Sequence, residues 1–310
     1  MDQKPNQTAD SRRFWVVFAV RLQIFLIAYL VAVTVAQHVF FLIEWFFGAP
    51  YYPALSILTM ALFIPLPSAL IATWWNIRSL PNDRIPPAGP ERGWDFVWMH
   101  YHWLLGTLAL FGLWSGLYFL VMQFTADRPM NTLFWPYDHL VPFRPEFVYV
   151  YLTVYWMFLV ALLGAKQPDE SRVTFKAGMY LLVVCMTVFI FYPVAYPRPE
   201  IAIDSLASWG LSIVYAADKP NNCFPSMHCA MVMLAGVVGL RRNRFTGLLL
   251  FIGAVEIGFS TLFTKQHFIA DVLGGFSLAL ISYGIVAYQK ELAAALDSNQ
   301  WRRWMERLIH

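Results

Sequence analysis

Residues 245–288 read FTGLLLFIGAVEIGFSTLFTKQHFIADVLGGFSLALISYGIVAY, and this stretch decides the fold. It contains two apolar runs, 245–264 and 267–288, each long enough to cross the roughly 30 Å hydrocarbon core of a bilayer as a helix. A short polar turn separates them. The stretch therefore predicts two antiparallel transmembrane helices joined by a turn that carries Lys265 and His267.

The same kind of apolar run recurs along the chain. Six further candidate spans lie at 22–43, 53–77, 98–124, 147–165, 176–196 and 226–240. Of the 310 residues 59% are hydrophobic and only 13% are charged, whereas roughly a quarter of an ordinary soluble domain is charged. We therefore expect an all-α, polytopic transmembrane bundle of about eight spans. Because Arg21 interrupts the first run, residues 11–21 either extend that span or form a short interfacial helix.

The basic side chains predict how the bundle is oriented. All but five of the 22 Lys and Arg residues lie in segments 1–21, 78–98, 166–176, 241–244 and 289–310. The positive-inside rule places these segments, and with them both termini, in the cytoplasm. The remaining five fall on the opposite face, which opens to periplasm, lumen or exterior; they are Arg128, Arg144, Arg198, Lys219 and Lys265.

The Pro- and Gly-rich loop at 79–93 suggests where the chain divides. We expect residues 1–97 to hold a cytoplasmic or interfacial segment, two accessory transmembrane helices and a linker. Residues 98–288 then form a six-span core, and 289–310 form an amphipathic cytoplasmic tail. A formal charge of +3 without a basic run among aromatics gives no reason to expect nucleic acid. The three cysteines have no CxxC spacing, so we interpret Cys185, Cys223 and Cys229 as packing residues.

The segment NNCFPSMHCA, residues 221–230, brings polar chemistry to the start of an apolar run. A helix that begins at Ser226 offers the free backbone N–H groups of Ser226 and Met227 and the positive end of its dipole, which together form an anion site. His228 then lies in the first turn, where it can protonate a leaving oxygen. The segment therefore predicts a phosphate site.

A second polar array follows in STLFTKQHFIADVLGG, residues 260–275. His267 and Asp271 are four residues apart, which makes them neighbours on one helical face. A carboxylate that fixes one ring nitrogen leaves the other as a nucleophile, so His267 is a candidate for forming a phosphohistidine. Two alternatives stay open: the pair is a structural hydrogen bond, or it ligates zinc together with His228. Three cations are available for phosphoryl oxygens, namely Arg198, which is favoured for its bidentate fork, Lys219 and Lys265.

These two arrays resemble a known family. PSMH at 225–228 and the series Ser260, His267 and Asp271 look like the second and third signature motifs of the type 2 phosphatidic acid phosphatase superfamily, whose membrane members are six-span lipid phosphatases and phosphotransferases. The resemblance covers roughly residues 98–288. It implies that His228 is the general acid, that His267 attacks phosphorus and that Asp271 orients His267.

The chain also departs from the phosphatase pattern. Thr261 stands where those enzymes usually carry Arg, Met227 where they carry Gly, and Phe191 where the first motif has Lys, although Arg198-Pro199 is present. The segment from Asp218 through FPSMH to TKQHFIAD looks closer to the branch that contains inositol phosphorylceramide synthases. The resemblance thus implies head-group transfer from a phospholipid to a lipid alcohol without a metal or other cofactor.

Other functions remain open from the sequence. With water as acceptor the same chemistry describes a lipid phosphate phosphatase. A non-catalytic transporter or scaffold is a more remote alternative, because the two halves show no matching pattern of broken spans. Three charged residues have no assigned role. Glu256 lies inside a span, where a packing hydrogen bond is favoured, and Asp138 and Arg144 lie in an outer loop, where capping and head-group binding are equally consistent.

Overall fold

The computed structural model describes residues 7–47, 109, 111–155, 157–158 and 168–289. Helices dominate them, and the β-type pairing within this part of the chain consists of isolated bridges. Four helical stretches are long and apolar enough to cross a membrane: Phe25–Phe46, Arg172–Phe191, Arg244–Phe263 and Ile269–Ala287. The prediction of an all-α transmembrane bundle is therefore confirmed. The predicted span at 53–77, the loop at 79–93 and nearly all of the tail lie outside the described residues.

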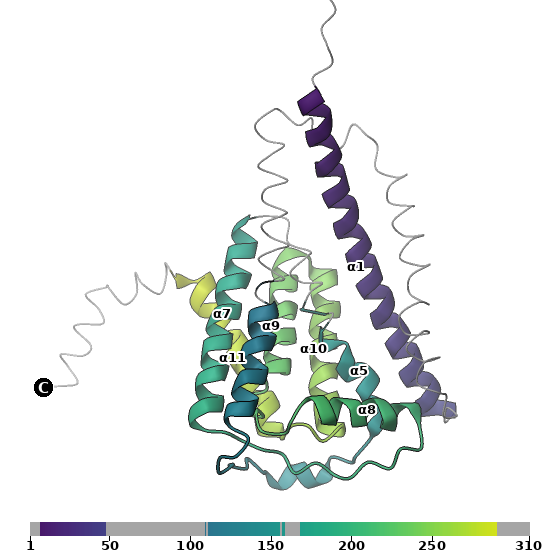
Figure 1. The fold of residues 1–310 in the computed structure, drawn as a ribbon, viewed down its shortest axis with the longest axis vertical. Helices are drawn as coiled ribbons and strands as arrows, with labels where there is room; N and C mark the ends of the chain where they lie inside the picture. Colours follow the sequence, from purple (N-terminus) through teal and green to yellow (C-terminus); the bar gives the residue numbers. More distant parts are fainter. Residues whose placement is uncertain (1–6, 48–108, 110, 156, 159–167, 290–310) are drawn as a thin grey trace, which may run out of the picture.

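The described helices follow one another from the N-terminal α1 to α11 (Figure 1). Their bounds are α1 (Gln7–Phe47), the 3-10 helices η1 (Pro136–Leu140) and η2 (Pro145–Phe147), α5 (Val148–Leu152), α7 (Pro168–Phe191), α8 (Leu206–Ala217), α9 (Met227–Arg242), α10 (Arg244–Phe263) and α11 (Ile269–Ala287). A further apolar helix spans Phe111–Phe124.

Several helices extend beyond the apolar runs that predicted them. α1 is continuous from Gln7, so residues 11–21 belong to the same helix as the first span. Arg is a good helix former, so Arg21 does not end the helix. A single charged residue can limit the apolar run without limiting the helix. α7 likewise begins at Pro168, eight residues before the predicted start at 176. Proline suits the first helical position because its missing N–H would be unpaired there anyway.

The core is built around α9. Eleven of the 16 residues of this helix are buried, and Ala230, Val232 and Leu234 are not exposed at all. The helix Phe111–Phe124 and α7, α10 and α11 contribute the side chains that surround it. Glycine allows α9 and α10 to approach closely, since a Cβ on Gly247 would lie 2.1 Å from the backbone nitrogen of Leu240. Small residues at such contacts are typical of helix packing in membranes.

The N-terminal helix α1 is attached to this core through a buried carboxylate. Glu44 accepts a hydrogen bond of 2.6 Å from the Tyr149 hydroxyl and one of 3.3 Å from the backbone N–H of Ala207. Ala207 lies in the first turn of α8, where a negative charge is favourable. Trp45 packs edge to face on Phe147 beside this contact. α1 is therefore fixed to the core near its C-terminal end.

The two ends of the bundle differ in structure. α8, η1 and the loop between α7 and α8 gather at one end, where α9 and α11 begin (Figure 1). Isolated parallel bridges join Asn131 to Val194 and Val194 to Asn222 there, so three connecting segments lie side by side. The opposite end carries Arg241, Arg242 and Arg244 between α9 and α10. Both predicted histidine arrays thus lie at the end with the structured loops.

Candidate active site

The start of α9 is held by Ser226. This residue is the N-cap, and its hydroxyl accepts a hydrogen bond of 3.4 Å from the Cys229 N–H. Its own N–H donates to the carbonyl of Asp271 at 3.0 Å, which ties the start of α9 to the first turn of α11. The amides of Met227 and His228 follow in the first turn, where the helix itself supplies no acceptor. Of the two predicted donors, the Ser226 amide is therefore occupied by Asp271, whereas the Met227 amide, like that of His228, has no acceptor within the helix.

His267 and Asp271 are joined, but not along one helix as predicted. α11 begins at Ile269, so His267 lies in the loop before it while Asp271 lies in its first turn. The Asp271 carboxylate caps the helix, because its Oδ2 accepts from the Phe268 N–H at 2.8 Å. The same oxygen lies 3.4 Å from Nδ1 of His267. The Asp271 carboxylate thus caps the N-terminus of α11 and also orients the imidazole of His267, whose Nε2 faces away from that bond.

The structure brings the two predicted histidines together. The ring centroids of His228 and His267 are 6.1 Å apart, although 39 positions separate the residues in the chain. Aromatic rings surround His228, and the hydroxyl of Tyr151 lies 3.3 Å from its Nε2. A phosphorus atom about 3 Å from one ring and a leaving oxygen about 3 Å from the other fit a gap of this size. The geometry suits two imidazoles that act on one phosphoryl group.

Arg198 reaches the same region through a buried charge pair. Its guanidinium lies 3.8 Å from the Asp218 carboxylate and also donates to the Asp218 carbonyl. The other carboxylate oxygen accepts from the Tyr118 hydroxyl at 2.6 Å, and the Tyr118 ring packs against His228. The Nε of Arg198 is buried without a partner among the described residues. Of the three predicted cations, Arg198 is therefore the one joined to a histidine through a network.

The two predicted lysines are directed elsewhere. Lys219 is exposed, and its ammonium donates to Gln123 at 3.3 Å. Lys265 donates to the carbonyl of Val141 at 2.5 Å and joins the turn before α11 to the loop after η1. Partial burial lowers the pKa of the Lys265 ammonium, and the carboxylate of Asp138 opposes that shift. Neither lysine forms a hydrogen bond with a histidine in the described part of the structure.

The three charged residues without an assigned role have structural partners. Asp138 accepts from the N–H of Ile269 at 2.9 Å and thereby caps α11 beside His267. Arg144 lies over the ring of Trp45, with 5.5 Å to the ring centroid. Glu256 lies 3.4 Å from Nε2 of His38 and so pairs α10 with α1. For Asp138, capping and head-group binding were equally consistent with the sequence, and the structure supports capping. For Glu256, the predicted packing hydrogen bond is formed with His38 of α1.

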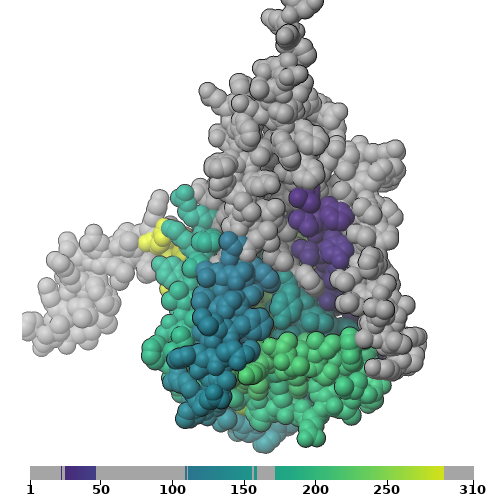
Figure 2. Space-filling view, in the orientation of Figure 1, coloured from purple at the N-terminus to yellow at the C-terminus, as the bar shows by residue number. Residues whose placement is uncertain are grey.

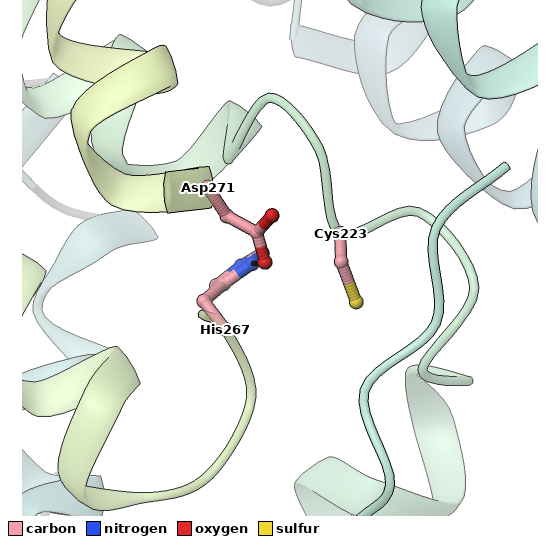
Figure 3. A group of neighbouring side chains, drawn as sticks. All are labelled: Cys223, His267 and Asp271. Carbon is pink, nitrogen blue, oxygen red and sulfur yellow. Dashed lines mark hydrogen bonds and ion pairs between the residues drawn. The ribbon is translucent and has the colours of Figure 1, made fainter. Parts of the chain in front are cut away.

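Cys223 is the neighbour that the sequence did not predict. It lies in the loop before α9, and its sulfur is close to His267 and Asp271, as Figure 3 shows. One donor atom from each of the three side chains lies within 4.8 Å of the others. Burial, with a further contribution from Asp271, raises the pKa of the Cys223 thiol, so the thiol is neutral at pH 7. Cys223 also packs in a buried apolar cluster with Val194 and Phe268, and Cys185 packs in the main core, as predicted for both.

An apolar cavity of about 170 Å³ opens beside His228. Its walls come from the helix Phe111–Phe124, α8 and α9, and they include Trp114, Phe119 and Ile213. Figure 2 shows the Phe111–Phe124 helix and α8 adjoining on one face of the molecule. Asp218 and His228 are its titratable acidic and basic groups, and Ser115, Tyr118 and Tyr155 add hydroxyls to the lining. The cavity thus connects apolar surface to one of the two histidines.

Comparison with known families agrees with this geometry. A family model described as the PAP2 superfamily matches residues 124–285, which is more than half of the chain and contains both arrays. The chain belongs to the PAP2 superfamily. No curated protein and no solved structure matches it. Membership in the PAP2 superfamily, together with the apolar helices, indicates a membrane protein with an activity of the lipid phosphatase or phosphotransferase type.

Other parts of this PAP2 site were not predictable from local patterns. Tyr118 and Tyr151 belong to apolar runs and look like ordinary membrane tyrosines, yet they contact the His228 region from positions 110 and 77 residues away. Asp218 was recognised as part of the family pattern but not as the partner of Arg198. The sequence signal for Asp218 was its position as an acidic residue directly after an apolar helix.

Proposed function

We propose that this PAP2-superfamily protein is an integral-membrane lipid phosphotransferase that moves a phosphorylated head group from a phospholipid to a lipid alcohol, as inositol phosphorylceramide synthases do. The observation that carries the proposal is the 6.1 Å separation of the His228 and His267 rings beside the Asp271 carboxylate. The assignments of His228, His267 and Asp271 rest on this juxtaposition and on their place in the family motifs. Residues 98–288 form the catalytic core in this scheme.

The first half of the reaction forms a phosphohistidine. Nε2 of His267 attacks phosphorus, the bond from phosphorus to the lipid oxygen breaks, and protonated His228 gives its proton to that oxygen. Asp271 holds Nδ1 of His267 and stabilises the positive charge that develops on the ring. In this scheme the first-turn amides of α9 and the guanidinium of Arg198 bind the nonbridging oxygens.

The second half returns the enzyme to its starting state. The acceptor hydroxyl gives its proton to neutral His228, its oxygen attacks phosphorus, and the bond from phosphorus to His267 breaks. A lipid alcohol such as ceramide yields the transferred head group, and water yields a phosphatase product. We place the site on the outer side of the membrane because the basic segments of the chain alternate with the site loops.

The cavity beside His228 supports a lipid substrate. Its walls are apolar, and its polar lining lies at the catalytic histidine. At about 170 Å³ it is smaller than the roughly 300–1,000 Å³ of sites for drug-sized ligands. It therefore suits the part of a lipid next to the phosphate, with the longer chains left in the bilayer.

The test is turnover of a labelled phospholipid by purified protein, with and without ceramide, and with the products separated by thin-layer chromatography. We expect a labelled ceramide product, and a loss of about 10²–10⁴-fold in His228→Ala and His267→Ala. His139→Ala is the control, since this exposed histidine packs on Phe134 at the same end of the molecule. Free phosphate or a dephosphorylated lipid as the sole product would show that the enzyme is a phosphatase and not a phosphotransferase. Near-normal turnover in either histidine variant would refute the mechanism.

A further inference from the structure

Three donor groups of different chemistry converge next to the proposed nucleophile. Cys223 comes from the loop before α9, His267 from the turn after α10, and Asp271 from the first turn of α11 (Figure 3). Their exposed fractions are 3%, 6% and 0%. Since one donor atom of each lies within 4.8 Å of the others, a single ion between them can reach all three.

The Asp271 carboxylate has an oxygen that the described protein does not satisfy. Oδ2 receives the bonds from Phe268 and His267, while Oδ1 is buried without a hydrogen-bond partner in the described structure. A buried acceptor that lacks a partner is unfavourable, because it has lost its hydrogen bonds to water. A cation beside this carboxylate would satisfy the remaining oxygen.

The donor set selects the ion. A thiolate, an imidazole and a carboxylate suit zinc, whereas Mg²⁺ and Ca²⁺ prefer oxygen ligands. Zinc bonds of about 2.0–2.3 Å place tetrahedral ligand atoms about 3.5 Å apart. Since the donor atoms lie within 4.8 Å of one another, each pair needs to close by about 1.3 Å at most. A thiol binds zinc as the thiolate, so Cys223 releases its proton to solvent when it binds the metal.

We propose that Cys223, His267 and Asp271 bind one Zn²⁺ and that the bound ion inhibits the enzyme. The inhibitory part rests on the proposed function, in which His267 is the nucleophile. Zinc on Nε2 of His267 occupies the attacking atom. Zinc on Nδ1 replaces the bond to Asp271, and the proton of the neutral ring then lies on Nε2, which no longer has a free lone pair. Either arrangement removes the nucleophile that phosphoryl transfer requires.

Metal binding is tested without reference to turnover. Detergent-purified protein, stripped with chelator, is titrated with Co²⁺, which reports a thiolate ligand by a charge-transfer band in the near ultraviolet. We expect one Co²⁺ per chain, a band that Zn²⁺ abolishes, and loss of the band in Cys223→Ala. Cys185→Ala is the matched control, because Cys185 is also buried but lies in the apolar core. The absence of a band in the wild-type protein, or a band that survives Cys223→Ala, would overturn the site.

Inhibition is tested by turnover with increasing free Zn²⁺, each variant being compared with its own rate in chelator. We expect the wild-type rate to fall at least tenfold, and Cys223→Ala to need at least tenfold more zinc for half-inhibition. Activation by zinc, or equal sensitivity of the two proteins, would contradict the inhibitory role. A wild-type protein that binds Co²⁺ but turns over no lipid in chelator would refute the proposed function and leave the metal site standing.

Discussion

At the scale of single residues, Asp271 combines two tasks that can be separated. Its Oδ2 caps α11 through the Phe268 N–H and also faces Nδ1 of His267. An asparagine at this position can still accept the capping hydrogen bond through its amide oxygen, but it has no charge to balance an imidazolium. The capping task contributes to folding, whereas the charge contributes to the proposed attack on phosphorus.

Asp271→Asn therefore separates stability from turnover. We expect kcat to fall by about 10²–10⁴-fold, with KM changed little and the unfolding temperature within a few degrees of wild type. Asp127→Asn, a change in an exposed loop residue, is the control. A kcat near the wild-type value would show that Asp271 has only a structural role.

Tyr151 has a smaller predicted effect on the same site. Its hydroxyl lies 3.3 Å from Nε2 of His228, and its ring is fully buried. Tyr151→Phe keeps the ring and removes one hydrogen bond, which is worth about 0.5–1.5 kcal/mol. Lipid turnover should therefore fall by a few-fold to about tenfold. A loss as large as that of His228→Ala would mean that the Tyr151 hydroxyl itself takes part in proton transfer.

At the scale of helices, the site depends on the crossing of α9 and α11. The N–H of Ser226 donates to the carbonyl of Asp271, and Gly275 lies where the two helices meet. A Cβ on Gly275 would lie 2.3 Å from the carbonyl oxygen of Ser226. Glycine at 275 therefore permits the contact that holds His228 near His267.

Gly275→Ala should separate the two helices and weaken the site. We expect a loss of about 1–3 kcal/mol of stability from overpacking, measured as a lower unfolding temperature in detergent, together with a strongly reduced rate of turnover. Gly284→Ala is the matched control in α11, because a Cβ there meets nothing within 4 Å in the described structure. Equal behaviour of the two variants would show that the crossing tolerates a methyl group.

Helix boundaries show where the sequence was sufficient and where it was not. The apolar runs predicted α10 and α11 to within two residues, because a bilayer requires about 20 apolar residues per span. The start of α11 was placed too early, since side-chain capping by Asp138 and Asp271, rather than hydropathy, sets it. Residues 147–165 were predicted as one span; there the structure describes α5 (Val148–Leu152), a one-residue turn at Thr153 and further helical residues at 154–155 and 157–158, and 159–165 lie outside the described residues.

At the scale of the whole molecule, the sequence indicated the residues of the candidate site more completely than the residues around them. His228, His267 and Asp271 stand in motifs with their own local chemistry, and the structure brings them together. The bond from Tyr118 to Asp218 joins residues 100 positions apart, and no local pattern encodes it. The same holds for Cys223, whose position beside His267 depends on how two loops close over one end of the bundle.

The two ends of the bundle differ, with the histidines at one end and a basic turn at the other, so the orientation of the bundle in the membrane can be measured by labelling each end. All three native cysteines are buried, so wild-type protein should react little with a membrane-impermeant maleimide. Leu140→Cys places an exposed thiol in η1 at the site end, and Thr246→Cys places one at the basic end. We expect Leu140→Cys to be labelled on intact cells and Thr246→Cys only after permeabilisation, because the positive-inside rule keeps the Arg241 to Arg244 turn in the cytoplasm. The reverse pattern would place the histidines on the cytoplasmic side, and the lipid would then have to be drawn from the inner leaflet.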